Sequence, residues 1–244
     1  MAIIGAAMVP HPPLIVPAVG RGGEKQIART ARAYEKAARA VAGWRPETVV
    51  ITTPHSVMYQ DYFHISPGGR ARGDFARSGA PGARYEVAYD SELVSEVAGL
   101  ARESGLAAGT AGERQPALDH GFLVPLHFLA QAMGSPWPCR FVRMGLSGLP
   151  FEAHYRLGRL IKEAARKLSR RVCLVASGDL SHYVRADGPY GLRAEGPAYD
   201  EQIMDIMGRA AFDELLAMPE TFCERAGECG QRSFGFSGCG CIKH

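Results

Sequence analysis

A short β-branched run at residues 48–53 limits the folds open to this chain. Prolines stand on both sides of the run, and an apolar stretch bounded in this way is typical of a buried strand. An amphipathic segment, 24–42, precedes it, and the apolar run 2–7 precedes that segment. A strand, a crossover helix and a second strand form a βαβ unit with parallel strands. The sequence therefore predicts that the chain begins as an α/β fold.

The same alternation continues to the C-terminal part of the chain. We therefore predict a single α/β domain, residues 1–244, with a mixed or mostly parallel central sheet and helices on both faces. The length and the 46% hydrophobic content are enough for one sizeable core. Residues 67–84, rich in glycine and arginine, are predicted to be a loop. Further strands are predicted at 62–65, 85–88, 140–146 and 172–176, and further helices at 91–104, from near 122, at 152–168 and at 199–218.

Three of the predicted strands run into loops that contain a histidine. His11 lies in Pro-His-Pro-Pro, His55 lies in Pro-His-Ser, and His182 ends Ser-Gly-Asp-Leu-Ser-His. Prolines remove backbone donors and fix φ, so the first two histidines are expected on stiff loops. In open α/β sheets, ligands bind outside the carboxyl ends of the strands. We therefore expect the three imidazoles to converge on one site.

Imidazoles at one site point to metal chemistry. Neutral histidines are the commonest metal ligands near neutral pH, and two of them with one carboxylate leave positions open on Fe(II). Glu228 is a candidate for the carboxylate, because the flanking glycines of Gly-Glu-Cys-Gly allow close backbone approach. Glu220 and Glu224 lie nearby and remain alternatives.

These motifs, together with Asp-His-Gly-Phe-Leu-Val-Pro-Leu at 119–126, resemble a known family. In order and spacing the sequence is similar to the catalytic B subunit of class III extradiol ring-cleavage dioxygenases of the protocatechuate 4,5-dioxygenase type. It is similar also to the related Memo family. The resemblance covers nearly the whole chain.

The resemblance implies roles for five residues. His11, His55 and Glu228 resemble the ligands of Fe(II), and His182 resembles the catalytic base. His120 resembles the histidine that hydrogen-bonds a substrate hydroxyl. The implied enzyme is an oxidoreductase that opens a catechol-type aromatic with dioxygen, beside the diol, with general base and metal dividing the work.

A departure from the family pattern and a second resemblance lead to alternatives. The family continues past its glutamate with an apolar closing segment, which this chain is expected to lack. The pattern Glu-Cys-Gly at 228–230 resembles the Memo family, in which a cysteine sits near the histidines and redox or copper roles have been proposed. The alternatives are a Memo-like metal-binding redox protein and a ligand-binding module without turnover. Cys229 would then be a further ligand or a reactive thiol.

The resemblance and the composition also indicate the partners. Family members form homodimers or bind a small capping subunit, and the most similar members lie beside or are fused to a radical-SAM-associated domain, so a protein partner is expected. The 28 basic and 25 acidic residues are scattered, which argues against nucleic acid. No stretch reaches the roughly 20 apolar residues of a membrane span, and no basic leader is present, so a cytoplasmic location is expected.

Other residues have simpler interpretations. His127 is expected to be a hydrogen-bonded core histidine. A structural zinc site is disfavoured, because the spacing of the C-terminal cysteines fits no standard pattern. Those cysteines are Cys223, Cys229, Cys239 and Cys241.

Overall fold

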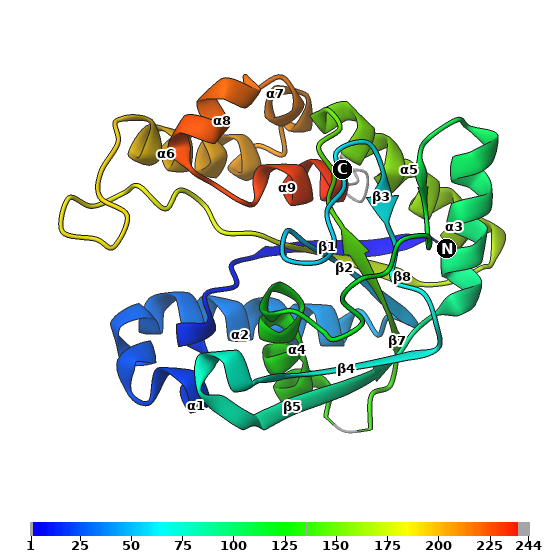
Figure 1. Ribbon diagram of the computed structural model, residues 1–244, viewed down its shortest axis with the longest axis horizontal. Helices are drawn as coiled ribbons and strands as arrows, with labels where there is room; N and C mark the ends of the chain where they lie inside the picture. Colours follow the sequence, from blue (N-terminus) through cyan, green and yellow to red (C-terminus); the bar gives the residue numbers. More distant parts are fainter. Residues whose placement is uncertain (1, 135, 239–244) are drawn as a thin grey trace.

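The computed structural model describes residues 2–134 and 136–238 (Figure 1). Its centre is a four-stranded sheet in the order β1-β8-β2-β7, and every pairing within it is parallel. This sheet confirms the predicted α/β class. The four strands are β1 (Ile3–Val9), β2 (Thr48–Thr53), β7 (Arg140–Gly145) and β8 (Val172–Ser177).

Helices cover both faces of this sheet, as predicted (Figure 1). Every residue of β2 and β8 is buried, which is why these strands have continuous apolar or β-branched sequences. Side chains alternate between the faces: Val49 and Ile51 join one hydrophobic cluster and Val50 joins the other. One face packs against α2 (Ala28–Gly43) and α4 (His120–Met133), and the other against α3 (Ser91–Glu103), α5 (Phe151–Lys167) and α9 (Gln231–Ser237).

The prediction of a loop at 67–84 is wrong. This segment forms an antiparallel hairpin of β4 (Arg70–Phe75) and β5 (Ala80–Ala88), joined by the 3-10 turn η3 (Ala76–Ser78). The hairpin buries few of its residues, so its sequence lacks the apolar run that identified the central strands. The short β3 (Phe63–His64) pairs with β6 (Ala108–Gly109).

The helix predicted at 199–218 is two helices, α6 (Glu195–Gly208) and α7 (Phe212–Leu216). The break lies at Ala210, whose φ of 53° is left-handed. The amphipathic pattern continues across the break because Ile206 and Leu215 bury in the same cluster. The segment predicted as one helix at 24–42 likewise begins with the 3-10 turn η2 (Gly23–Ile27) before α2, and it follows η1 (Pro13–Ile15) and α1 (Pro17–Gly20).

Two C-terminal helices were not predicted, α8 (Glu220–Ala226) and α9. The hydroxyl of Ser233 in α9 donates to the carbonyl of Ser177 at 2.9 Å and accepts from Thr52 at 3.0 Å. These bonds hold α9 against the carboxyl ends of β8 and β2. The loop 227–230 is thereby held beside the same edge of the sheet. Cys239, Cys241 and the expected truncation beyond them lie outside the described residues. Within the described ranges, no helix has the length and apolar character needed to cross a membrane.

Candidate metal centre

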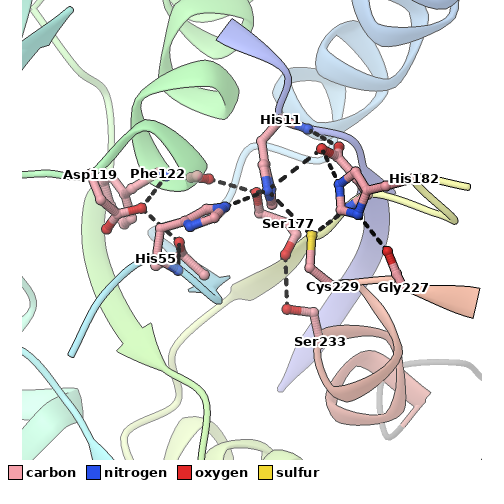
Figure 2. Close-up of polar contacts among 12 residues, drawn as sticks. His11, His55, Asp119, Phe122, Ser177, His182, Gly227, Cys229 and Ser233 are labelled. Atoms are coloured by element: carbon pink, nitrogen blue, oxygen red, sulfur yellow. Dashed lines mark hydrogen bonds and ion pairs between the residues drawn. The ribbon is translucent and has the colours of Figure 1, made fainter. Parts of the chain in front are cut away.

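The carboxyl ends of β1, β2 and β8 bring histidines together (Figure 2). His11 follows β1 and His55 follows β2, and their Nε2 atoms lie 3.0 Å apart. His11 is buried, whereas His55 is exposed to solvent on one side. Two ring nitrogens at this distance face the same point, which is where a cation would be held.

The tautomer of His11 follows from its neighbours. The hydroxyl of Ser177 donates its single proton to the carbonyl of Gly121 at 2.6 Å. It must therefore accept from the Nδ1–H of His11, which lies 2.9 Å away. The proton on Nδ1 leaves Nε2 with a free lone pair aimed at His55. A ligand imidazole in metalloproteins is oriented by this kind of hydrogen bond through its other nitrogen.

His120 completes a first group of possible ligands. Asp119 caps α4, accepting from the backbone N–H of Phe122 at 3.2 Å and from the hydroxyl of Thr53 at 2.6 Å. This places the ring of His120, the first residue of α4, with its centroid 3.9 Å from that of His55. The ligand atoms of His11, His55 and His120 all lie within 4.8 Å of one another.

A second group shares His11 and adds oxygen and sulfur. Asp179 Oδ2 lies 3.8 Å and Cys229 Sγ 3.6 Å from His11 Nε2. The backbone N–H of Asp179 donates to Cys229 Sγ at 3.2 Å, and its carboxylate accepts from the backbone N–H of His11 at 2.7 Å. A side chain at Gly178 would place its Cβ 2.3 Å from the Cα of Gly230, so only glycine allows this approach of the two loops. The two groups form one continuous donor set around His11 Nε2.

Burial keeps the imidazoles neutral. It lowers the pKa of His11 to about 4, and it lowers the pKa values of His55 and His120 as well. Neutral imidazole is the form that binds a metal, so the group needs no deprotonation at neutral pH. Burial works against ionisation of Asp179, yet its hydrogen bonds with the His182 side chain and the His11 backbone N–H lower its pKa overall.

His182 lies beside the second group, and its pKa is raised, whereas the pKa values of the other three histidines are lowered. Its Nδ1 donates to the carbonyl of Gly227 at 2.5 Å, and its Nε2 lies 3.7 Å from Asp179 Oδ2. Hydrogen bonds with Asp179 and then Cys229 raise its pKa to about 11. With this pKa, the His182 side chain is protonated at neutral pH and can give a proton. Its side chain is 34% exposed, so a ligand from solvent can reach it.

The structure does not bring Glu228 into either group of described residues with ligand atoms within 4.8 Å. Its carboxylate accepts from the backbone N–H of Gln231 at 2.5 Å, at the start of α9, and burial raises its pKa. The adjacent Cys229 faces the histidines instead. The ligand role of Glu228 stays a prediction. From the sequence, Cys229 was named as a further ligand only in the Memo-like alternative, and Asp179 was not named as a ligand, although Asp179 belongs to the Ser-Gly-Asp-Leu-Ser-His motif.

Two further predictions can be placed. His127 is hydrogen-bonded on both ring nitrogens, to Tyr85 at 2.9 Å and to Gln131 at 2.8 Å, as expected of a satisfied histidine. Cys139, Cys173, Cys223 and Cys229 are free thiols, and the first three are buried.

Comparison with known proteins identifies the family of the chain. Residues 5–235 match a family described as the catalytic LigB subunit of aromatic ring-opening dioxygenase. Protein CA_C1420 of Clostridium acetobutylicum is 32% identical in an alignment of 249 positions. The alignment covers 96% of this chain and 51% of that protein. The chain thus spans about half the length of this relative.

Two further relatives have functional names. The 2-aminophenol 1,6-dioxygenase beta subunit of a Pseudomonas species is 22% identical over 92% of this chain and 80% of its own length. A MEMO1 family protein of Thermococcus onnurineus is 28% identical over 75% of this chain and 62% of its own. The similarity therefore extends to both groups of proteins that the motifs resemble.

Proposed function

Because the chain belongs to the family of catalytic LigB subunits of aromatic ring-opening dioxygenases, we propose that it is a non-haem Fe(II) extradiol dioxygenase-like enzyme. Its substrate would be a catechol-type aromatic, opened by dioxygen beside the diol. The observation that carries the proposal is the 3.0 Å approach of the Nε2 atoms of His11 and His55, with the lone pair of His11 fixed by Ser177.

His11 and His55 would hold the iron, and a carboxylate would be the third ligand. Asp179 offers a carboxylate oxygen within reach of His11 Nε2. Glu228, the carboxylate expected from the family, would have to release the N–H of Gln231 first. When bound, the iron would supply Lewis acidity to the substrate oxygens and would pass electrons from the substrate to dioxygen, while the protein supplies orientation and proton handling.

His120 and His182 would act on the substrate hydroxyls. Burial keeps His120 neutral, so it can share a hydrogen bond with a hydroxyl. His182 is held by Gly227 through Nδ1, which leaves its Nε2 to exchange a proton. As a base it must first be neutral. Its pKa is high because Asp179 and Cys229 face it, so any cation that engages these two groups lowers that pKa toward neutrality.

The test is anaerobic reconstitution with Fe(II), followed by oxygen-electrode measurements on catechol, protocatechuate and 2-aminophenol. We expect stoichiometric oxygen uptake and a ring-opened product that contains both oxygen atoms. His11→Ala should abolish both uptake and iron binding, whereas His127→Ala, remote from the donor set, should retain them. Iron-loaded protein that consumes no oxygen with any of these substrates would reject the dioxygenase proposal.

The second candidate is a Memo-like metal-binding redox protein, which the position of Cys229 favours. Its Sγ lies 3.6 Å from His11 Nε2, and thiolate ligands select zinc and copper(I) over harder ions. Copper or zinc that is retained through purification, and lost in Cys229→Ser, would support this function. Retention that is unaffected by Cys229→Ser would count against it. A non-catalytic binding module would instead retain ligand affinity in His182→Ala.

The setting of the enzyme is also part of the proposal. We expect a homodimer, a small capping subunit or an adjacent domain, because one relative is named a beta subunit and another is about twice as long. A cytoplasmic location suits the free thiols of the described residues. Size-exclusion chromatography with light scattering would identify the oligomeric state.

A further inference from the structure

Exposed apolar side chains gather on the segments that leave the metal-binding edge of the sheet. The described residues include seven large hydrophobic side chains exposed to solvent, and five of them follow His11, His55 or His182 by ten residues or fewer. Neighbouring exposed apolar residues commonly mark a binding surface. The five are Leu14, Met58, Val184, Tyr190 and Leu192.

Three of the five lie on one projecting segment, residues 184–192, which we call the arm. The arm connects β8 to α6 and reaches outward beyond the body of the protein, at the left of Figure 1. An antiparallel bridge between Val184 and Leu192 closes it, and a turn from Arg185 to Gly188 forms its tip. Tyr190 is the most exposed of its apolar residues, at 62%.

The base of the arm is firmly held. The guanidinium of Arg193 stacks over the ring of Tyr183 at 3.8 Å, and its backbone N–H donates to the carbonyl of Tyr183 at 3.1 Å. The ring of Tyr183 also packs so closely on Gly227 that a Cβ at residue 227 would lie 2.1 Å from the ring. The arm therefore has a defined position relative to His182, which is bonded to the same Gly227.

The side chain of Tyr190 lies close to His182. Its ring centroid lies 5.3 Å from that of His182, with the planes tilted by 55°. A molecule that reaches the exposed part of His182 can therefore also contact Tyr190. The charges of the arm are satisfied locally, because Arg185 and Asp187 form a two-pronged ion pair at 3.0 and 2.6 Å. The surface offered to the molecule is aromatic and aliphatic.

We propose that Tyr190 and Leu192 are specificity-determining residues, which contact an uncharged apolar substituent on the aromatic ring of the substrate. This inference rests on the proposed function and names its substrate class: ring diols with an alkyl or aryl side chain, preferred over diols with a carboxylate. The preference arises because burying an apolar group against Tyr190 and Leu192 removes apolar surface from water, which is favourable. A carboxylate placed against the apolar atoms of these two side chains would lose hydration that they cannot replace.

The test is calorimetric binding under anaerobic conditions to the Fe(II)-loaded full chain, with catechol, 4-propylcatechol and protocatechuate as probes. We expect 4-propylcatechol to bind about tenfold more tightly than the other two. The double variant Tyr190→Ser, Leu192→Ser should remove this preference, so that the variant binds 4-propylcatechol and catechol with equal affinity. Met204→Ser, at an exposed apolar residue of α6, is the matched control and should change nothing.

The outcomes separate the two proposals. If catechol binds and the preference for 4-propylcatechol is missing or survives the double variant, the arm does not select the substituent and the inference is wrong. If no diol binds to the iron-loaded protein, the dioxygenase proposal falls and the inference falls with it. Because the substituted side chains are exposed, circular dichroism should show an unchanged fold.

Discussion

Replacing Arg143 should destabilise the fold and loosen the segment that positions His120. This arginine of β7 is fully buried and donates to four acceptors, three of them on the segment 113–117. Its Nη1 donates to the carbonyl of Ala117 at 2.7 Å, and its Nη2 donates to the carbonyl of Gln115 at 2.7 Å and to Glu113 at 3.1 Å. Its Nε donates to the hydroxyl of Ser66 at 2.7 Å. That segment leads directly into the cap and first residue of α4.

The magnitude follows from these contacts. Arg143→Met keeps the aliphatic stem and removes the guanidinium. Breaking a buried ion pair costs about 3–5 kcal/mol, and a hydrogen bond to a charged group is worth about 1.5–3 kcal/mol. Glu113 and the residues around it are partly exposed, so their freed acceptors can bind water. We therefore expect the lower end, a loss of about 3 kcal/mol in the free energy of unfolding.

Urea unfolding at pH 7, followed by tryptophan fluorescence, measures this loss. Arg70→Met is the matched control, because the ion pair of Arg70 with Glu86 is exposed and should be worth less than about 1 kcal/mol. The Arg143 variant should also bind Zn(II) about tenfold more weakly, since His120 loses its fixed position, and the control should not. A loss below about 1 kcal/mol for Arg143→Met, at an unchanged m-value, would show that the segment is held by other contacts.

Three further predictions test the site and the core. Free metal at 100 times its Kd should add about 2.7 kcal/mol of stability, seen as a higher Tm in scanning fluorimetry, and His11→Ala should abolish the gain. Ser177→Ala removes the acceptor that fixes the His11 tautomer, so the affinity for Zn(II) measured by titration should fall about 10- to 100-fold; an unchanged affinity would refute this role. Burial lowers the pKa of His154 to about 4. As the pH falls, His154 is therefore protonated in the unfolded chain before it is protonated in the folded protein. The neutral, buried His154 contributes about 3 kcal/mol to the free energy of unfolding above pH 6.5, and this contribution is lost as the pH falls from 6.5 to 4. Urea unfolding from pH 4 to 7.5 should show a shallower pH dependence for His154→Gln.

The central strands could be predicted because burial on both faces leaves a continuous apolar or β-branched sequence. The run at 48–53 became β2 with the predicted bounds. The hairpin β4–β5 could not be found in this way, because its strands are largely exposed and rich in arginine and glycine. The break at Ala210 was also hidden, since the apolar positions on either side remain in phase.

The site was predictable as far as strand ends define it. The proline-bounded loops placed His11 and His55 at the same edge, because parallel strands end together. Contacts between distant segments were not predictable: Cys229 reaches His11 across 218 positions of sequence. Which of two adjacent residues, Glu228 or Cys229, faces the histidines depends on how α9 begins. The local pattern Glu-Cys-Gly gave a possible role to both residues and did not decide between them.

The strand order explains why one serine can affect so much of this site. β8 lies between β1 and β2, so the residue at its carboxyl end touches the segments on both sides. The side chain of Ser177 binds His11 and the start of α4, while its carbonyl accepts from Ser233 of α9. Ser233 in turn accepts from Thr52 of β2, which closes a chain of hydrogen bonds between three strands and the C-terminal helix. The orientation of His11 therefore depends on the docking of α9, some 220 residues away along the chain.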